Sequence, residues 1–219
     1  MSITMVLSRA TMSSTTISTF QLFELFPDQQ AARKYLEARL WPSGATCPAC
    51  KSLGRITARR NEFYHCNACN SDFTIRTETI FERSHVPLHK WLYAMYLLVT
   101  ARKGISSLQL AKEIGITQKS AWFVLHRLRE ACGGSRSSQD VQHGPASLDN
   151  TGSFCAVLRR GLYGVYHRPS AKHMSRYVNE FTFRLNDGNV KRHTLERLDS
   201  FVDAVVGKRI TYKNLTAAK

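Results

Sequence analysis

Two cysteine pairs constrain the fold of this chain more than any other feature of its sequence. Cys47 and Cys50 form the first pair, and after fifteen intervening residues Cys66 and Cys69 form the second. Two residues between paired thiolates let both sulfurs turn toward one point, and the separation of the pairs is typical of zinc sites. A hairpin that brings the pairs opposite each other would complete a tetrahedral shell of four thiolates around Zn2+.

Four thiolates leave no ligand position open for water or substrate, so the predicted zinc is structural. A segment of this length cannot bury a core of its own, whereas metal binding contributes about 10–16 kcal/mol to small zinc modules near neutral pH. Two disulfides or four unconnected cysteines are the alternatives. Disulfides require an oxidising compartment, which we do not expect because no signal peptide opens the sequence. We expect His65, beside the second pair, to be a strand residue rather than a ligand.

The charge of the chain indicates a polyanionic partner. Its 219 residues include 31 Lys and Arg against 16 Asp and Glu, a formal net charge of +15. A surface of this kind binds phosphate backbones with release of counterions, so double-stranded DNA is the first candidate. A merely solvated basic surface, or attraction to anionic lipid, is the alternative. We expect no membrane partner, because no apolar run reaches the length that spans a bilayer.

Composition and apolar periodicity divide the chain into six regions. The first is dominated by Ser and Thr and is expected to be disordered. In the second, Asp28 is expected to cap a helix that Trp41-Pro42 ends. Within the cysteine segment, two short apolar runs predict a hairpin. The regions are a tail (1–19), an N-terminal helical segment (20–45), a zinc ribbon (46–82), a helical region (84–132), a linker (133–149) and a C-terminal region (150–219).

The end of the helical region has the pattern of a helix-turn-helix. Ser106 or Ser107 caps a short helix, Gly115-Ile116 turns the chain, and Thr117 caps a second helix that runs toward Cys132. One face of the second helix is apolar, so the opposite face is expected to enter a major groove with its first turn leading. A generic helical hairpin is the alternative. The predicted DNA contacts of this helix are Thr117, Gln118, Lys119, Ser120, Phe123, His126 and Arg127.

Two arginine pairs are further candidates for contacts with DNA. Arg59 and Arg60 lie at the turn of the predicted hairpin, and Arg159 and Arg160 follow the linker. Contacts with phosphate position a protein on DNA without reading its base sequence. Arg59 and Arg60 could equally be solvated strand residues.

The order of motifs along the chain resembles a bacterial insertion-sequence transposase of the ISXO-like group. In the front part the matching residues are the two cysteine pairs, Phe81, Ser84, Pro87, Lys90-Trp91, Lys103-Gly104-Ile105-Ser106, Lys119-Ser120-Ala121-Trp122-Phe123, His126-Arg127 and Arg129-Glu130. In the far part they are Leu158-Arg159-Arg160-Gly161, Gly164, Tyr166-His167, His173, Arg176-Tyr177, Glu180-Phe181, Phe183-Arg184, Asn186 and Gly207-Lys208-Arg209. The resemblance runs from about Phe20 onward and implies a zinc ribbon, a helix-turn-helix and a DDE catalytic domain of RNase H-like fold.

Members of that group are similar to one another in a central segment with two catalytic aspartates on strands of the RNase H-like sheet. Here the linker stands in its place, and no strand is expected around Asp140 or Asp149. The third carboxylate of the group resembles the glutamate of an Asn-Thr-x-Glu run, where this chain reads Asn150-Thr151-Gly152-Ser153. Phosphoryl transfer by two metal ions needs several carboxylates on a rigid scaffold. We therefore expect no catalytic residues in this chain. Intact members of the group are expected to use Mg2+, but we expect none to bind here. We expect Glu180 to be a surface or helix-packing carboxylate.

These observations predict a mainly α fold with a small β zinc ribbon, followed by a helix-turn-helix and a helical remnant of an RNase H-like transposase domain. The predicted function is the binding of insertion-element ends without cutting them, in the bacterial cytoplasm at the nucleoid. Besides duplex DNA, the expected partners are full-length transposase or a second copy of the chain. Two alternatives stay open: an active DDE strand-transferase completed by a partner chain, and a transcriptional regulator that uses the same ribbon and helix-turn-helix.

Overall fold

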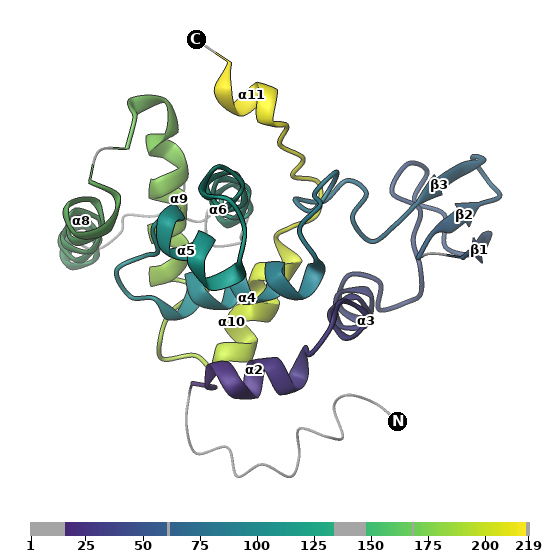
Figure 1. Cartoon of the computed structure of the whole chain (residues 1–219), viewed down its shortest axis with the longest axis horizontal. Helices are drawn as coiled ribbons and strands as arrows, with labels where there is room; N and C mark the ends of the chain where they lie inside the picture. Colours follow the sequence, from purple (N-terminus) through teal and green to yellow (C-terminus); the bar gives the residue numbers. More distant parts are fainter. Residues whose placement is uncertain (1–15, 61, 134–147, 168, 218–219) are drawn as a thin grey trace.

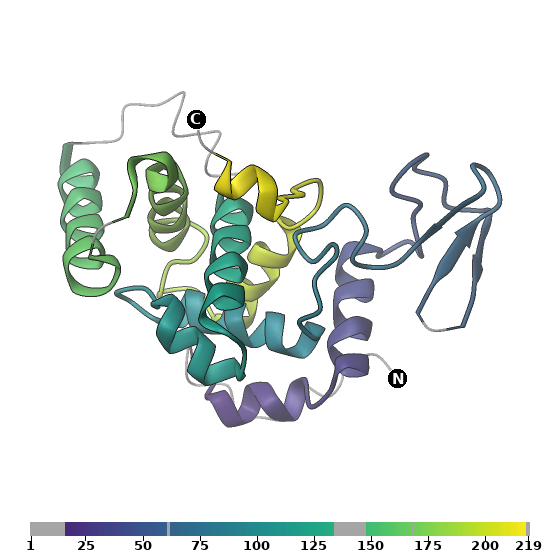
Figure 2. The ribbon, with the colours of Figure 1, turned by 45° about the horizontal axis from the view of Figure 1, so that its top comes forward.

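The computed structural model describes residues 16–60, 62–133, 148–167 and 169–217. Helices make up most of this part, and a small sheet of three short strands projects from one side of the helical body (Figure 1). This arrangement confirms the predicted class, mainly α with a small β ribbon. Figures 1 and 2 both place the sheet and helix α8 (Leu148–Gly161) on opposite sides of the body.

Two capped helices open the described part of the chain. Helix α2 (Thr19–Leu25) begins after Ser18, whose side chain and backbone exchange hydrogen bonds with Gln21 in a capping box. Helix α3 (Gln29–Leu40) begins after Asp28, whose carboxylate accepts a hydrogen bond of 2.7 Å from a backbone N–H of the first turn. The predicted cap at Asp28 is confirmed, because this carboxylate satisfies an N–H group that has no partner within the helix.

Helix α4 (Leu88–Thr100) is the centre of the body, because apolar side chains cover almost its whole circumference and are buried. Helices α3, α5 (Ser107–Ile114), α6 (Gln118–Cys132) and α10 (Thr194–Asp203) pack against it. At 13 residues, α4 is too short to cross a bilayer. Within the described ranges, no helix combines the length and apolarity that a membrane span requires.

The sheet is antiparallel throughout, with the strands side by side in chain order. Cys66 of the middle strand lies opposite Ile56 on one side and Ser71 on the other. The strands are β1 (Ile56–Ala58), β2 (Tyr64–Cys66) and β3 (Ser71–Phe73). The first two strands agree with the predicted hairpin.

Aromatic side chains attach the sheet to the C-terminal end of α3. The Trp41 ring packs edge-on against Tyr64, with centroids 5.3 Å apart, and against Phe73 at 5.8 Å. The Tyr64 hydroxyl donates a 3.0 Å hydrogen bond to the carboxylate of Glu37. The ribbon therefore has a defined seat on the helical body, although its own buried cluster contains only two cysteines and one phenylalanine.

The C-terminal region packs on the front half and shares its hydrophobic core. Phe183 and Phe201 belong to the same buried cluster as residues of α2 to α6. Helix α9 lies along α6, and α10 contacts α3 and α4. At the surface, Arg39 of α3 forms a bidentate ion pair with Asp203, at 2.6 and 2.8 Å. Besides α8 and α10, this region contains the π-helical turn η2 (Leu162–Tyr166), the 3-10 turn η3 (Ala171–His173), α9 (Met174–Leu185) and α11 (Tyr212–Thr216).

The boundaries of the predicted tail and linker differ from the structure by a few residues. Ile17 is buried, and its carbonyl accepts a 2.8 Å hydrogen bond from the Tyr96 hydroxyl, so the packed chain begins before residue 20. Helix α8 begins at Leu148, so Asp149 lies on a helix. Residues 1–15 and 134–147 lie outside the described part of the chain.

Candidate metal centre and nucleic-acid interface

The four predicted zinc ligands converge on one point. Their sulfurs all lie within 4.8 Å of one another, with 3.6 Å between Cys47 and Cys69 and 3.5 Å between Cys50 and Cys66. In a tetrahedral centre with Zn–S bonds of about 2.3 Å the sulfurs are roughly 3.8 Å apart, so the arrangement fits zinc. A disulfide would bring two sulfurs to about 2.05 Å. All six cysteines are free, so the disulfide alternative is not formed.

In each cysteine pair, the backbone favours the thiolate form of one sulfur. The residue after each pair takes a left-handed conformation, with φ of 60° at Lys51 and 55° at Asn70. Burial raises the pKa of Cys47, but hydrogen bonds from the backbone of Cys50, from Cys69 and from other groups lower it to about 6. The backbone N–H groups of Cys69 and Ala68 lower the pKa of Cys66 in the same way. The ribbon backbone therefore favours a thiolate at Cys47 and at Cys66, whereas at Cys50 a backbone hydrogen bond from Ser52 is outweighed by burial and the neighbouring sulfurs, which raise the pKa to about 12.

His65 lies in strand β2 and is not part of the sulfur cluster. Its Nδ1 is 2.7 Å from a carboxylate oxygen of Asp72 on the neighbouring strand. The expected strand position of His65 is therefore confirmed.

The predicted helix-turn-helix residues form two helices joined by a tight turn. Ser106 caps α5, and Gly115 ends it in the left-handed conformation at φ 63°. Thr117 caps α6, its hydroxyl accepting a 3.2 Å hydrogen bond from the N–H of Ser120. Gln118 bridges the two helices by donating to the Ser107 hydroxyl at 2.8 Å.

The structure exposes the start of α6 and buries the rest. Thr117, Gln118 and Lys119 are exposed, and Ser120 is half-buried. Phe123, one turn later, is also half-buried because its ring packs edge-on against Tyr212 of α11 at 5.6 Å. The ammonium of Lys119 lies 5.1 Å from the centre of the same tyrosine ring. Helix α11 therefore covers the predicted outward face beyond the first turn, which the sequence pattern did not predict.

The predicted outward orientation is wrong for His126 and Arg127, which are 0% and 5% exposed. The Arg127 guanidinium donates to the carbonyls of Ile80 and Glu82 at 2.7 and 2.8 Å, and so holds the segment between the ribbon and α4. Apolar periodicity placed these residues opposite the core face. It could not anticipate that the segment before α4 and helix α9 cover that second face.

His126 lies among aromatic rings instead of facing solvent. The Trp122 and His173 rings have their centroids 4.3 and 4.6 Å from it. Burial, followed by the positive charges of Arg129 and of protonated His173, lowers the pKa of His126 to about 2. The imidazole therefore remains neutral at any physiological pH.

The two arginine pairs lie far from each other. Arg59 and Arg60 are exposed at the tip of the ribbon, and the Arg59 guanidinium is 3.5 Å from the Asp72 carboxylate. Arg159 and Arg160 are exposed at the end of α8, on the other side of the body (Figures 1 and 2). One continuous surface does not join the two pairs with the start of α6.

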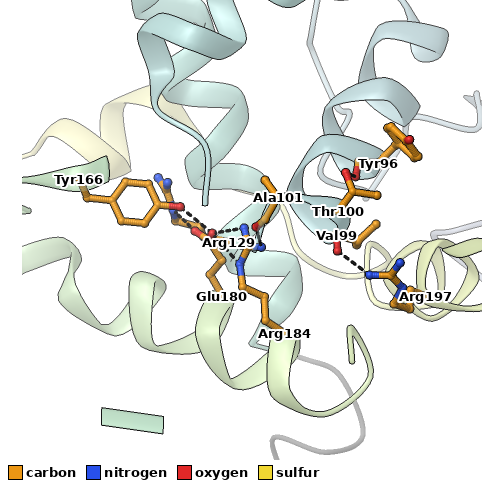
Figure 3. Close-up of polar contacts among 9 residues, drawn as sticks. All are labelled: Tyr96, Val99, Thr100, Ala101, Arg129, Tyr166, Glu180, Arg184 and Arg197. Atoms are coloured by element: carbon orange, nitrogen blue, oxygen red, sulfur yellow. Dashed lines mark hydrogen bonds and ion pairs between the residues drawn. The ribbon is translucent and has the colours of Figure 1, made fainter. Parts of the chain in front are cut away.

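A buried charge cluster connects α6, η2 and α9 (Figure 3). Glu180 is 0% exposed. Its carboxylate accepts hydrogen bonds of 2.7 Å from Arg129, 2.6 Å from Arg184 and 2.7 Å from the Tyr166 hydroxyl. Burial raises the pKa of Glu180, but the two guanidinium groups outweigh it and lower the pKa to about 2. Glu180 is therefore a packing carboxylate whose oxygens are already engaged by cations.

Two arginines from the C-terminal region cap the end of α4 (Figure 3). Arg197 donates to the carbonyl of Val99 at 2.7 Å, and Arg184 donates to the carbonyl of Ala101. Carbonyls at a helix C-terminus lack partners within the helix and carry partial negative charge, so guanidinium groups satisfy them well. The motif pattern missed these contacts, although the spacing of Glu180 and Arg184 at i and i+4 is a readable signal for an ion pair.

The carboxylates that the sequence singled out do not form a cluster in the described residues. Asp140 lies outside those residues, and Asp149 lies on α8 and not on a strand. Within the same ranges, the four cysteines are the group of His, Cys, Asp and Glu side chains close enough to hold a metal ion together.

Two separate parts of the chain match known protein families. Residues 27–72 match the family described as "Transposase zinc-ribbon domain", and residues 124–186 match the "ISXO2-like transposase domain". A protein of Halobacterium salinarum described as "Uncharacterized protein in transposable element ISH50" is 30% identical over 127 residues. That match covers 57% of this chain and 42% of the relative, so the chain spans less than half of the relative's length. No solved structure matches the chain.

The two matches follow the geometry of the molecule. The first contains the four cysteines and the helix that seats the ribbon, and the second joins most of α6 to the region of the Glu180 cluster. The resemblance inferred from the motif order is thereby confirmed. Two parts of the chain are therefore similar to ISXO2-like transposases of insertion sequences.

Proposed function

We propose that this protein binds the duplex ends of an insertion element through the ribbon and the start of α6, and that it does not cut them. The observation that carries the proposal is the exposed first turn of α6. Thr117, Gln118 and Lys119 are exposed to solvent, while most of the remaining side chains of the helix are buried by packing. Helix-turn-helix proteins read base edges with this part of the second helix.

The ribbon supplies a second contact in this proposal. The four cysteines bind structural zinc, which fixes the hairpin and its exposed arginines, Arg59 and Arg60, on the seat formed by α3. These arginines contact phosphate, so they add affinity and orientation without base discrimination. The net charge of +15 supports binding to a polyanion.

Two observations support the proposal that the protein does not cut DNA: the sequence of the linker region and the ion pairs of Glu180. The linker stands where the family holds two catalytic aspartates, and the Asn-Thr run before α8's arginines lacks its glutamate. Glu180 faces Arg129 and Arg184, and these cations compete with any divalent metal for its oxygens. The chain would then occupy element ends in competition with a full-length transposase.

Footprinting on fragments that carry the inverted repeats beside the gene tests specific binding. We expect protection of the repeats, and an affinity that falls with salt at a slope of about −0.9 per phosphate contacted. Lys119→Ala is expected to weaken binding to the repeats by about 5- to 150-fold, the range for one base contact. Lys191→Ala removes an equally exposed charge from the loop before α10 and is the matched control.

Two results would contradict the proposal. Equal affinity for the repeats and for unrelated DNA would remove the specific-recognition part. Nicking of the repeats by the purified protein with Mg2+ or Mn2+ would remove the non-cutting part and favour the strand-transferase alternative.

A further inference from the structure

A second basic surface lies at the end of the body opposite the ribbon. It is formed by the loop after α4, with Arg102 and Lys103, and by the end of α8, with Arg159 and Arg160. All four side chains are exposed. Neither residues 101–104 nor residues 154–167 contain an Asp or Glu, so no carboxylate of these segments neutralises the charge.

The two segments of this surface are joined through the buried cluster of Figure 3. Ala101, directly before Arg102, gives its carbonyl to Arg184. Gly104, directly after Lys103, lies so close to Tyr166 that a Cβ added there would be 2.1 Å from the phenol oxygen. Tyr166 in turn donates to Glu180. The loop and η2 are therefore in contact, with exposed cations beside this contact in the loop and at the end of α8.

An exposed aromatic ring lies one helical turn beyond Arg159 and Arg160. Tyr163 is 75% exposed, although a tyrosine usually buries most of its ring. This exposure leaves the ring open to a partner. The ring projects from a π-helical turn, a widened geometry that is frequent at functional sites.

An open aromatic ring among cations has a defined recognition chemistry. Proteins that bind single-stranded nucleic acid combine a cationic track for the phosphates with aromatic side chains on which unpaired bases stack. Duplex DNA would use the cations but not the ring, because its bases are already stacked on one another. An acidic peptide would likewise leave the ring without a planar partner.

We propose that the surface formed by Arg102, Lys103, Arg159, Arg160 and Tyr163 binds single-stranded DNA, with a base stacked on Tyr163. This site is separate from the α6 and ribbon surface of the proposed function. In both views α8 lies across the body from the ribbon (Figures 1 and 2), so a duplex bound at the ribbon would leave this surface accessible.

Fluorescence anisotropy with the full chain and a labelled oligothymidine of about 15 nucleotides, long enough for one such site, tests the proposal. Tyr163→Ala is expected to weaken binding by about 5- to 150-fold, the effect of losing one stacked base. Tyr163→Phe, which keeps the ring, is expected to bind as the wild type does. The double variant Arg159→Ala/Arg160→Ala is expected to weaken binding and to reduce its salt dependence by about two phosphate contacts.

Matched controls separate this site from the duplex site. Tyr212→Ala removes another exposed tyrosine, 40% exposed and beside Lys119, and is expected to leave oligothymidine binding unchanged. Lys119→Ala is expected to weaken duplex binding alone. The proposal is overturned if Tyr163→Ala binds oligothymidine like the wild type, or if it weakens duplex and single strand equally. Either outcome leaves the duplex reading by α6 standing.

Discussion

The ribbon and the C-terminal region hold their shapes by opposite means. The ribbon's own buried cluster consists of Cys47, Cys66 and Phe73, so its cohesion depends on the four sulfurs and the metal that they fit. The C-terminal region contributes Phe183, Leu198 and Phe201 to the main core, and a buried ion-pair cluster fixes it to α6. One region therefore depends on a ligand, and the other on packing that includes buried charge.

The difference has a consequence for function. We expect that a metal-dependent ribbon can unfold without loss of the body, because its seat on α3 consists of a few aromatic and polar contacts. The C-terminal region, in contrast, is packed closely on helix α6, since α9 lies along it and Tyr212 of α11 packs against Phe123. The segment after residue 148 therefore helps to fix helices α5 and α6 in place.

Removal of zinc is expected to give the largest loss of stability, and to unfold the ribbon while the helical body stays folded. Chelation, or the double variant Cys50→Ser/Cys69→Ser, removes a contribution of about 10–16 kcal/mol from the ribbon. Hydrogen exchange should show loss of protection in residues 46–73 while α4 and α6 stay protected. Unfolding of both regions together would show that the body also depends on the metal.

Substitution of Glu180 is expected to give the next largest effect, on the body. Glu180→Gln leaves Arg129 and Arg184 buried without a counter-charge, and the loss of one partner of a buried pair costs about 3–5 kcal/mol. Denaturant unfolding of the zinc-loaded protein measures it. Glu196→Gln is the matched control, because Glu196 pairs with Arg192 at 3.8 Å on the surface, and such pairs contribute about 0–1 kcal/mol. Equal effects of the two variants would refute a stabilising role for the buried cluster.

The pH dependence of the body separates two titrating groups. The folded-state pKa of His126 is about 2, below the ordinary 6.5, so the unfolded chain binds a proton that the folded chain excludes. Stability is therefore complete above pH 6.5 and falls as pH decreases, by about 1.4 kcal/mol per unit at most. Glu180, lowered from the ordinary 4.5 to about 2, adds a further loss only below pH 4.5.

His126→Phe isolates the first of these windows. It keeps an aromatic ring against Trp122 and His173 but cannot bind a proton. Between pH 6.5 and 5 its stability, followed by denaturant unfolding of the body, should be less sensitive to pH than that of the wild type. An unchanged pH dependence would assign the effect to another group.

The sequence predicted those features that local rules determine. The cysteine spacing, the caps at Asp28 and Thr117 and the Gly115 turn need only a few neighbouring residues, and all appear where expected. The buried positions of His126 and Arg127 and the cover of Phe123 by Tyr212 depend on elements 47 to 89 residues away in the chain. Apolar periodicity predicts one buried face of a helix. Helix α6 has a second buried face, because the chain after the linker packs against it.

The smallest expected effect concerns the seat between the two regions. Tyr64→Phe keeps the ring against Trp41 and Phe73 and removes only the hydroxyl that donates to Glu37 at 3.0 Å. This hydrogen bond joins strand β2 to the end of α3. The loss of one such hydrogen bond costs about 1 kcal/mol. Zinc binding should be unchanged, since no ligand moves, while hydrogen exchange at the end of α3 and in β2 should quicken. If Tyr64→Phe instead releases zinc, the seat and the metal centre stabilise each other, and the independence of the two regions would have to be abandoned.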